Sequence, residues 1–232
     1  KEIRLQLAES QIEDAVIDSV ITSIEEDESE KRFWNKSDKG VITMIHYLFR
    51  QFLEDNGFYK YSPEGSKHFI FVRVTNNLID HTNEEEIKDF VLGYLEDLDD
   101  MSVYNYFADK TRFFREEFLS LLGTVDVYFI EDDKDTAYLY YRNCAVKVSK
   151  TKKTTIDYLD LGGYVWKDQV IDREFDLCDS FNCDYKTFIN NISGGDKQTI
   201  LSMRSTIGYM LHAYKNLSYC PAIILNDEII SE

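Results

Sequence analysis

The chain has 232 residues, a formal net charge of −17, 44% hydrophobic residues and 14% aromatic residues. The apolar content is sufficient for a packed core, so disorder as the main state is excluded. The acidic balance also excludes a protein that coats DNA without specificity, because the phosphates would repel it at a distance.

No apolar run approaches the roughly 20 residues that a membrane-spanning helix needs. The four cysteines lack the spacing of a zinc site, which favours free thiols in a reducing compartment. We therefore expect a cytoplasmic protein without a membrane partner. The sequence begins with Lys1 rather than Met, so we also expect it to be part of a longer protein.

Helical periodicity dominates the first part of the chain. Residues 5–24 have an apolar stripe and an acidic opposite face, which predicts an amphipathic helix. A second helix is expected over 41–55, ended by Asn56 and Gly57. Residues 58–74 predict a hairpin that turns at Pro63–Gly65.

Two further helices and a meander follow. Thr82 or Asn83 is expected to cap the next helix, with Glu85 or Glu86 completing a capping box. Another helix is predicted over 103–122. After Gly123 the apolar period becomes about two. This change predicts an antiparallel meander of three strands, joined in part by an acidic turn, over 125–130, 136–143 and 144–150.

The last part returns to helical patterns from about Phe175 and ends in a strand-like run over 221–226. The whole order predicts an α+β fold: N-terminal helices with a hairpin, an antiparallel β-meander, then a C-terminal helical segment ending in a strand. We divide it into an acidic helix and linker (1–40), an α+β domain (41–175) and a third segment (176–232).

The stretch NISGGDKQTI superficially resembles a phosphate-binding loop. Such a loop needs G-x-x-x-x-G-K-[ST] after a buried strand, whereas here Asp196 precedes Lys197 and Gln198 occupies the hydroxyl position. A carboxylate at this place would repel a phosphate. We therefore predict that Ser193 or Asp196 caps a helix that begins near Lys197.

The acidic turn offers a second candidate. Asp133 and Asp135 form a D-x-D pair, which in a nuclease or primase would share a divalent metal ion. Aspartate is also common in hairpin turns, because it bonds to its own backbone. The local turn is the preferred interpretation, and a metal-dependent nuclease or primase is kept as an alternative function.

A compact basic stretch follows the tyrosine-rich strand. Its lysines are Lys147, Lys150, Lys152 and Lys153, and Tyr138, Tyr140 and Tyr141 precede them. Lysines beside aromatic rings suit single-stranded nucleic acid, since the charges follow the phosphates and the rings stack on bases. The alternative is an exposed lysine-rich loop that protects an edge strand from aggregation.

Two segments carry a family resemblance: AYLYYRNCAVKVSKTKKTTIDYLDLGGYVWKDQVIDREF (137–175) and STIGYMLHAYKNLSYCPAIILNDEIISE (205–232). Both resemble the region that precedes the motor in superfamily 3 helicases of bacteriophages and mobile elements, a group that includes the poxvirus primase-helicase. Residues 32–110 match this group more loosely. The resemblance implies that 41–175 is a collar-like domain and that 176–232 begins an incomplete AAA+ ATPase domain.

The same resemblance implies a function for the intact protein. It would be an ATP-dependent replicative DNA helicase that forms a homo-oligomeric ring, expected to be a hexamer, on single-stranded DNA in the cytoplasm of a bacterial host cell. ATP and Mg²⁺ would bind at a P-loop downstream of Glu232, so no catalytic or cofactor-binding residue is assigned within this chain. We therefore expect the chain alone to be inactive as an ATPase.

A third interpretation involves no enzyme. The net charge of −17 would suit an acidic interaction protein that binds a basic partner or mimics DNA. A stoichiometric, salt-sensitive complex with such a partner, without single-strand binding, would favour it.

Overall fold

The fold is α+β, as predicted. The computed structural model describes residues 32–98, 100–177 and 183–224, so the helix predicted over 5–24 lies outside the described residues. The predicted strand over 221–226 lies partly outside them, and residues 221–224 are not in a strand. No helix in the described ranges is long and apolar enough to cross a membrane.

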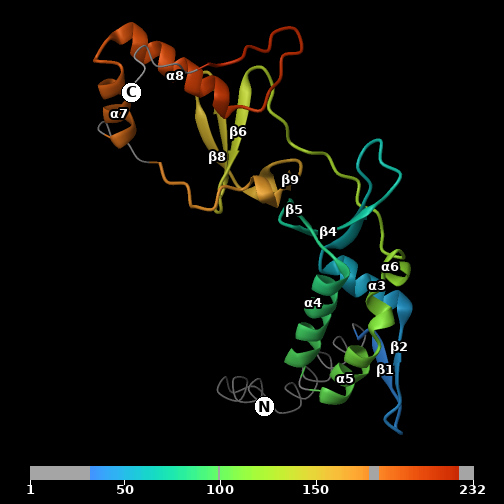
Figure 1. The fold of residues 1–232 in the computed structure, drawn as a ribbon. Coiled ribbons are helices and arrows are strands. Elements are labelled where there is room, and N and C mark those ends of the chain that lie inside the picture. The colour runs from blue at the N-terminus through green and yellow to red at the C-terminus, as the bar shows by residue number, and fades with distance from the viewer. Residues whose placement is uncertain (1–31, 99, 178–182, 225–232) are drawn as a thin grey trace, which may run out of the picture. The chain divides into compact units, whose positions relative to one another are not determined.

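The chain divides into two compact units (Figure 1). The first holds the described residues up to Thr75 together with Asp80–Asp126, and the second holds Asn76–Ile79 together with the described residues from Val127 onward. The division of the chain by function at residues 40 and 175 stays a prediction. The two compact units reflect packing within the chain, which does not test a division by function.

Two short hairpins, four α-helices and a 3-10 helix form the described part of the first unit. Strand β1 pairs antiparallel with β2, and β3 pairs antiparallel with β4, which confirms the hairpin predicted over 58–74. The elements are β1 (Trp34–Lys36), β2 (Ile42–Met44), α3 (His46–Asp55), β3 (Phe58–Tyr61), β4 (Ile70–Thr75), α4 (Glu84–Asp97), α5 (Met101–Asp109), the 3-10 helix η1 (Thr111–Phe114) and α6 (Glu116–Leu119).

An aromatic cluster forms the core of this unit. Phe33 is fully buried, and its ring centroid lies 4.6 to 6.1 Å from those of Trp34, Phe49, Phe52, Tyr94 and Phe107. Tilted and edge-on pairs at these distances add about 0.5–1.5 kcal/mol each beyond the burial of their area. The high aromatic content of the chain is therefore used for packing here.

Two helix predictions in this unit were wrong in their extent. The helix predicted over 41–55 begins only at His46, because Ile42–Met44 pairs with β1 and buries Met44. The helix predicted over 103–122 is broken at Lys110 and Arg115, whose backbones leave the helical region. These breaks allow the adjacent Phe113 and Phe114 to be buried together.

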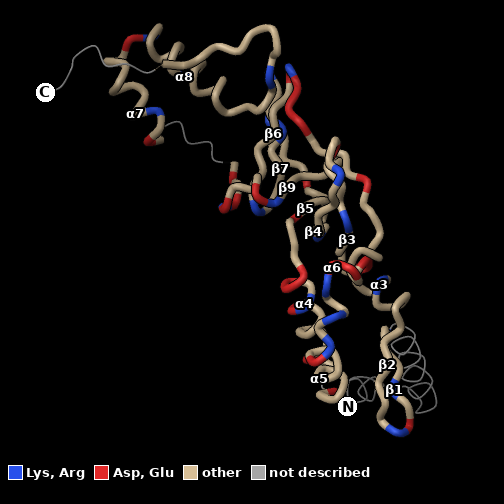
Figure 2. The backbone as a smooth tube through the Cα atoms, turned by 45° about the vertical axis from the view of Figure 1, so that its right-hand side comes forward, with Lys and Arg blue, Asp and Glu red and all other residues tan. Residues whose placement is uncertain are grey.

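The helix cap predicted before residue 84 is confirmed. The Asn83 side chain accepts hydrogen bonds from the main-chain N–H groups of Glu85 and Glu86, and the Glu86 carboxylate accepts one from Asn83 N–H. Three glutamates therefore gather at the positive end of the α4 dipole, drawn in red in Figure 2.

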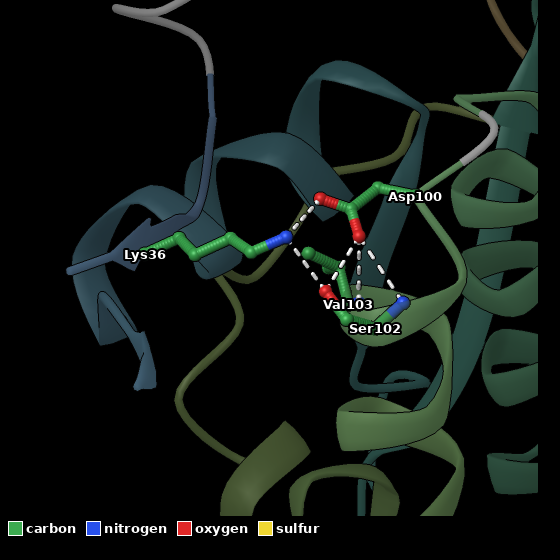
Figure 3. Close-up of polar contacts among 4 residues, drawn as sticks. All are labelled: Lys36, Asp100, Ser102 and Val103. Carbon is green, nitrogen blue, oxygen red and sulfur yellow. Dashed lines mark hydrogen bonds and ion pairs between the residues drawn. The ribbon is translucent and has the colours of Figure 1, made fainter. Parts of the chain in front are cut away.

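An ion pair joins β1 to the start of α5 within the same unit (Figure 3). Lys36 Nζ lies 2.8 Å from Asp100 Oδ2 and 2.7 Å from Ser102 Oγ, while Asp100 Oδ1 caps α5 by accepting from the N–H groups of Ser102 and Val103. The hydrogen bonds from Lys36 and Ser102 lower the pKa of Asp100 to about 2.

The second unit contains an antiparallel sheet, a short parallel pair and two helices. The sheet has the order β6-β7-β8, and β5 pairs in parallel with β9 through Leu78 and Ile79. The elements are β5 (Leu78–His81, whose last two residues belong to the first unit), β6 (Thr136–Tyr140), β7 (Ala145–Ser149), β8 (Lys153–Ile156), η2 (Tyr158–Asp160), β9 (Val165–Trp166), η3 (Lys167–Gln169), α7 (Asp184–Ile192) and α8 (Lys197–Leu211).

The predicted meander was right in two strands and wrong in the third. β6 and β7 pair as expected, but their third partner is β8 and not residues 125–130. That segment runs beside Tyr164 instead: Tyr164 N–H donates to Tyr128 O at 2.8 Å, and Ile130 N–H donates to Tyr164 O at 3.0 Å.

Two adjacent glycines make this arrangement possible. A Cβ on Gly163 would lie 2.6 Å from Ile130 Cδ1 and 2.9 Å from Tyr128 O, so the close approach requires glycine. Gly162 faces open space but has a φ of +75°, which glycine adopts without strain.

A buried hydroxyl links the small cores of the second unit. Tyr158 Oη donates to Tyr141 O at 2.6 Å, and burial raises the pKa of Tyr158 to about 12. Tyr158 packs with Tyr140, Ala145 and Val165, whereas Tyr141 belongs to the cluster with Cys144 and Val146. The phenol therefore stays protonated and remains a donor at neutral pH.

Acid should weaken the Lys36–Asp100 contact. The folded pKa of Asp100, about 2, lies below its ordinary value of 3.8, so the contribution is complete above about pH 4 and is lost as the pH falls toward 2. Asp100→Asn keeps a capping side chain but removes the charge. We expect the variant to be less stable than the wild type near neutral pH, by up to about 1 kcal/mol, because the two side chains are 41% and 39% exposed.

Urea unfolding in a Trp166→Phe background would check this, because Trp34 fluorescence then reports the first unit. The difference between wild type and Asp100→Asn should shrink as the pH falls from about 5 to about 2, because Asp100 takes up its proton in this range. Asp38→Asn, at an exposed carboxylate of the same unit, is the matched control. A difference that persists unchanged at low pH would contradict the ion pair.

Candidate nucleic-acid interface

The four predicted lysines lie together in the β7–β8 hairpin. Lys147 is the central residue of β7, Lys150 and Lys152 lie in the turn, and Lys153 begins β8. Ser149 ties the turn, because its N–H donates to Lys152 O at 2.8 Å and its Oγ accepts from Lys152 N–H at 3.2 Å. The structure therefore places three exposed lysines and the half-buried Lys147 in one hairpin.

The strand register separates these lysines by face. Lys147 lies opposite Tyr138 on β6, and its Nζ is 5.6 Å from the centre of the Tyr138 ring. Lys153 lies opposite Val148, one residue further along, and so belongs to the other face of the sheet. Of the four lysines, Lys147 is the one whose ammonium group lies over an aromatic ring in the described structure.

The three tyrosines are not equivalent either. Tyr138 and Tyr140 stack with their ring centroids 6.4 Å apart and an interplanar angle of 7°. Tyr140 is buried, and burial together with the nearby Asp132 charge raises its pKa. Tyr141 is buried against Phe175 in the other cluster. Tyr138, which is half-buried, is therefore the one of the three with ring surface for a base.

An aspartate that the sequence did not single out organises this face. Asp132 Oδ1 accepts from Tyr138 N–H and Asp132 Oδ2 accepts from Ala213 N–H, each at 2.7 Å. One carboxylate thus joins the middle of β6 to the segment after α8. Three acids occur side by side at 131–133, and their order gives no signal that the middle one has this role.

The D-x-D pair forms a local turn. Asp133 Oδ1 accepts from Asp135 N–H at 2.7 Å, and Asp133 N–H donates to Thr136 O at 2.9 Å. Among the residues that the structure describes, no group of three or more histidine, cysteine or acidic side chains could hold a metal ion. The geometry gives the nuclease or primase alternative no support.

A cavity of about 630 Å³ opens between β6, the segment after η3 and the residues that follow α8. Twelve residues line it: Ile130, Glu131, Asp132, Tyr138, Leu139, Tyr140, Gln169, Ile171, Leu211, Ala213, Tyr214 and Lys215. They come from segments that are far apart in sequence, so no motif could have indicated the cavity.

The glycine-containing loop before α8 is a helix cap, as predicted. Asp196 Oδ2 accepts from Thr199 N–H at 2.7 Å and from Thr199 Oγ1 at 2.8 Å, and α8 begins at Lys197. These bonds lower the pKa of Asp196, so its carboxylate stays ionised at the position that a phosphate would need. The element before the loop is the helix α7 and not a strand.

Helix α8 has an apolar stripe that is not fully buried. Ile200, Met203 and Ile207 are half-buried, whereas Met210 and Leu211 are more than half exposed. The helix also ends at Leu211, so His212 lies beyond it and not on it. No described residue of α8 is fully buried.

Comparisons of the chain with protein-family models, with curated proteins and with solved structures found no match. The likeness to superfamily 3 helicases therefore rests on the two sequence segments quoted above.

Removing the Asp132 carboxylate should release the segment after α8. Asp132→Ala deletes the acceptor of the Ala213 N–H, and a hydrogen bond to a charged acceptor contributes about 1.5–3 kcal/mol. Amide hydrogen exchange measured by NMR should then be roughly ten-fold faster or more at Ala213. Asp133→Ala, which removes a bond within one turn only, is the control. Equal protection of Ala213 in both variants would contradict the role of Asp132.

Proposed function

We propose that the chain is the N-terminal portion of an ATP-dependent replicative DNA helicase of the primase-helicase type in superfamily 3. Its own share of that activity is to contact single-stranded DNA and to contribute to the assembly of a ring. The observation that carries the proposal is the lysine hairpin of the second unit, in which Lys147 lies over the accessible ring of Tyr138.

The hairpin supports strand binding in spite of the acidic net charge. Residues 147–153 contain four lysines and no acid, and Lys150, Lys152 and Lys153 are exposed. Charges further away than about 8 Å are largely screened at physiological salt, so a phosphate near the turn responds mainly to these lysines. Contacts between these lysines and phosphates do not depend on base sequence, so they can hold any single strand.

The α7 helix supports the assembly role. Tyr185, Phe188 and Ile192 are 46%, 58% and 48% exposed, and their spacing of three and four residues places them on one side of the helix. Ile189, four residues after Tyr185, lies at the edge of the same side and is buried. Apolar side chains gathered on one exposed helical face are typical of an interaction surface, and in a ring the partner would be a second copy of the chain.

The two rival functions find less support. The acids at the start of α4 act within the fold, since Glu86 completes a cap and Glu84 Oε1 accepts from Glu116 N–H at 2.6 Å. Two of these carboxylates therefore have a structural role, although all three glutamates at the start of α4 are exposed. Asp133, which a nuclease or primase would need, is bonded in its own turn.

Replacing the exposed lysines should flatten the salt dependence of DNA binding. Lys150→Gln, Lys152→Gln and Lys153→Gln together remove three phosphate contacts, and each contact to a single strand contributes about 0.7 to the slope of log K against log salt. Fluorescence anisotropy with a labelled oligonucleotide should show a slope smaller by about 2. The control replaces Lys39, Lys67 and Lys88 of the first unit and gives the same net charge. If the triple variant and the wild type have equal slopes, the hairpin lysines do not contact phosphates and are ordinary surface charges.

ATP hydrolysis should require residues beyond this chain. The α8 N-terminus is occupied by the Asp196 carboxylate, so these residues do not fit a nucleotide phosphate there. We expect the 232-residue chain to have no ATPase activity. A protein extended by a whole domain should hydrolyse ATP in the presence of Mg²⁺. Equal hydrolysis by both proteins, measured as phosphate release, would overturn the assignment.

A further inference from the structure

The cavity beside β6 has walls that are held in place within the second unit. One wall is the strand itself, with Tyr138, and a second contains Gln169 and Ile171. The third is the segment 211–215, which the Asp132–Ala213 hydrogen bond joins to the strand. The volume of about 630 Å³ exceeds the roughly 300 Å³ at which ligand pockets begin.

Apolar surface faces this cavity without being covered. Leu211, Ile171 and Tyr214 are 62%, 40% and 37% exposed, and all three line it. Together with the half-buried Tyr138 ring they form sides against which a flat apolar ligand would lose water-exposed area. The geometry thus favours a planar aromatic ligand over a small ion.

The polar groups in the cavity select for hydrogen-bond donors. Glu131 offers carboxylate oxygens, and the exposed Gln169 offers an amide oxygen and an amide N–H₂. The Gln169 side chain makes no hydrogen bond to another residue in the described part of the chain. Carboxylates repel phosphate but accept from the amino groups of cytosine, adenine and guanine. Thymine has no exocyclic amino group to donate.

Cations lie where a nucleic-acid backbone would pass. Lys215 lines the cavity, and Lys147 lies over the Tyr138 ring that forms one of its sides. A strand whose phosphates contact these lysines would present a base to the cavity, with the charged backbone outside and the ring inside.

We propose that this cavity binds one unpaired, amino-bearing nucleobase of a single DNA strand whose phosphates are held by the lysine hairpin. The inference rests on the proposed contact with single-stranded DNA and adds a base-binding subsite to it. Tyr138 and Tyr214 contact the ring faces, and Gln169 with Glu131 bonds the amino edge.

The test compares a cytosine-only with a thymine-only oligonucleotide of about a dozen nucleotides, within the range of single-strand site sizes. Binding is followed by fluorescence anisotropy. The variants are Tyr214→Ala and Gln169→Ala, both at exposed positions where the fold should not depend on the side chain. The matched controls are Tyr128→Ala and Gln198→Ala, which are also exposed but do not line the cavity.

Wild type should bind the cytosine strand more tightly than the thymine strand. Tyr214→Ala should weaken binding of the cytosine strand about ten-fold, the loss of one stacking contact, and leave the salt slope unchanged. Gln169→Ala should reduce the preference for cytosine. In the variant with Lys150, Lys152 and Lys153 all replaced by Gln, the slope of log K against log salt should become smaller, while the preference for the cytosine strand persists.

Two negative results are distinguishable. If wild type binds both strands equally, and neither cavity variant differs from its control, the base subsite is overturned although lysine-dependent binding stands. If wild type binds neither strand, the proposed contact with DNA fails, and the base subsite fails with it. Free 2′-deoxycytidine should compete with the cytosine strand for binding to wild type but not for binding to Tyr214→Ala. Competition with both proteins would mean that the nucleoside binds outside the cavity, which would count against the proposal.

Discussion

The two hydrogen bonds that Asp132 accepts determine the geometry of the second unit around its candidate site. They join Tyr138, the central residue of β6, to Ala213, which lies 81 residues after Asp132 in the chain. Closing a long flexible loop costs several kcal/mol, more than one charged hydrogen bond returns. The contact is therefore effective because the intervening chain is already ordered by the β6-β7-β8 sheet and the Tyr158 hydroxyl.

The first unit depends on a different kind of interaction. Its core is an aromatic cluster around Phe33, in which many rings pack at tilted or edge-on angles. Contacts of this kind are short-ranged and not directional in the way of a hydrogen bond, so their number matters more than any single pair. The Lys36–Asp100 pair fixes the start of α5 against β1 but is half-exposed, and it contributes far less than the rings.

Features set by neighbouring residues could be predicted from the sequence. The Asn83 cap, the Asp196 cap, the hairpin over 58–74 and the Asp133 turn each depend on bonds between residues a few positions apart or on alternating apolar residues. The four lysines also come together as expected, because one hairpin carries them all.

Features set by distant residues could not be predicted. Residues 125–130 have the alternation of a strand, but their partner is Tyr164. The apolar stripe of α8 has the period of a core face, yet none of its residues is fully buried. Which lysine meets a tyrosine follows from the register of β6 and β7, and a shift of one residue would have placed Lys147 on the opposite face. The Asp132 contacts and the cavity likewise need the folded chain.

The two glycines at 162 and 163 are subject to different evolutionary constraints. Gly162 is required for its backbone angle in open space, so asparagine or aspartate is an acceptable replacement in related sequences. Gly163 is required for space, and a larger residue there would press on Ile130. Substitutions at 163 and 130 should therefore covary among homologues. Because Ile130 lines the cavity, replacing Gly163 would also alter the shape of the cavity, although residue 163 does not line it.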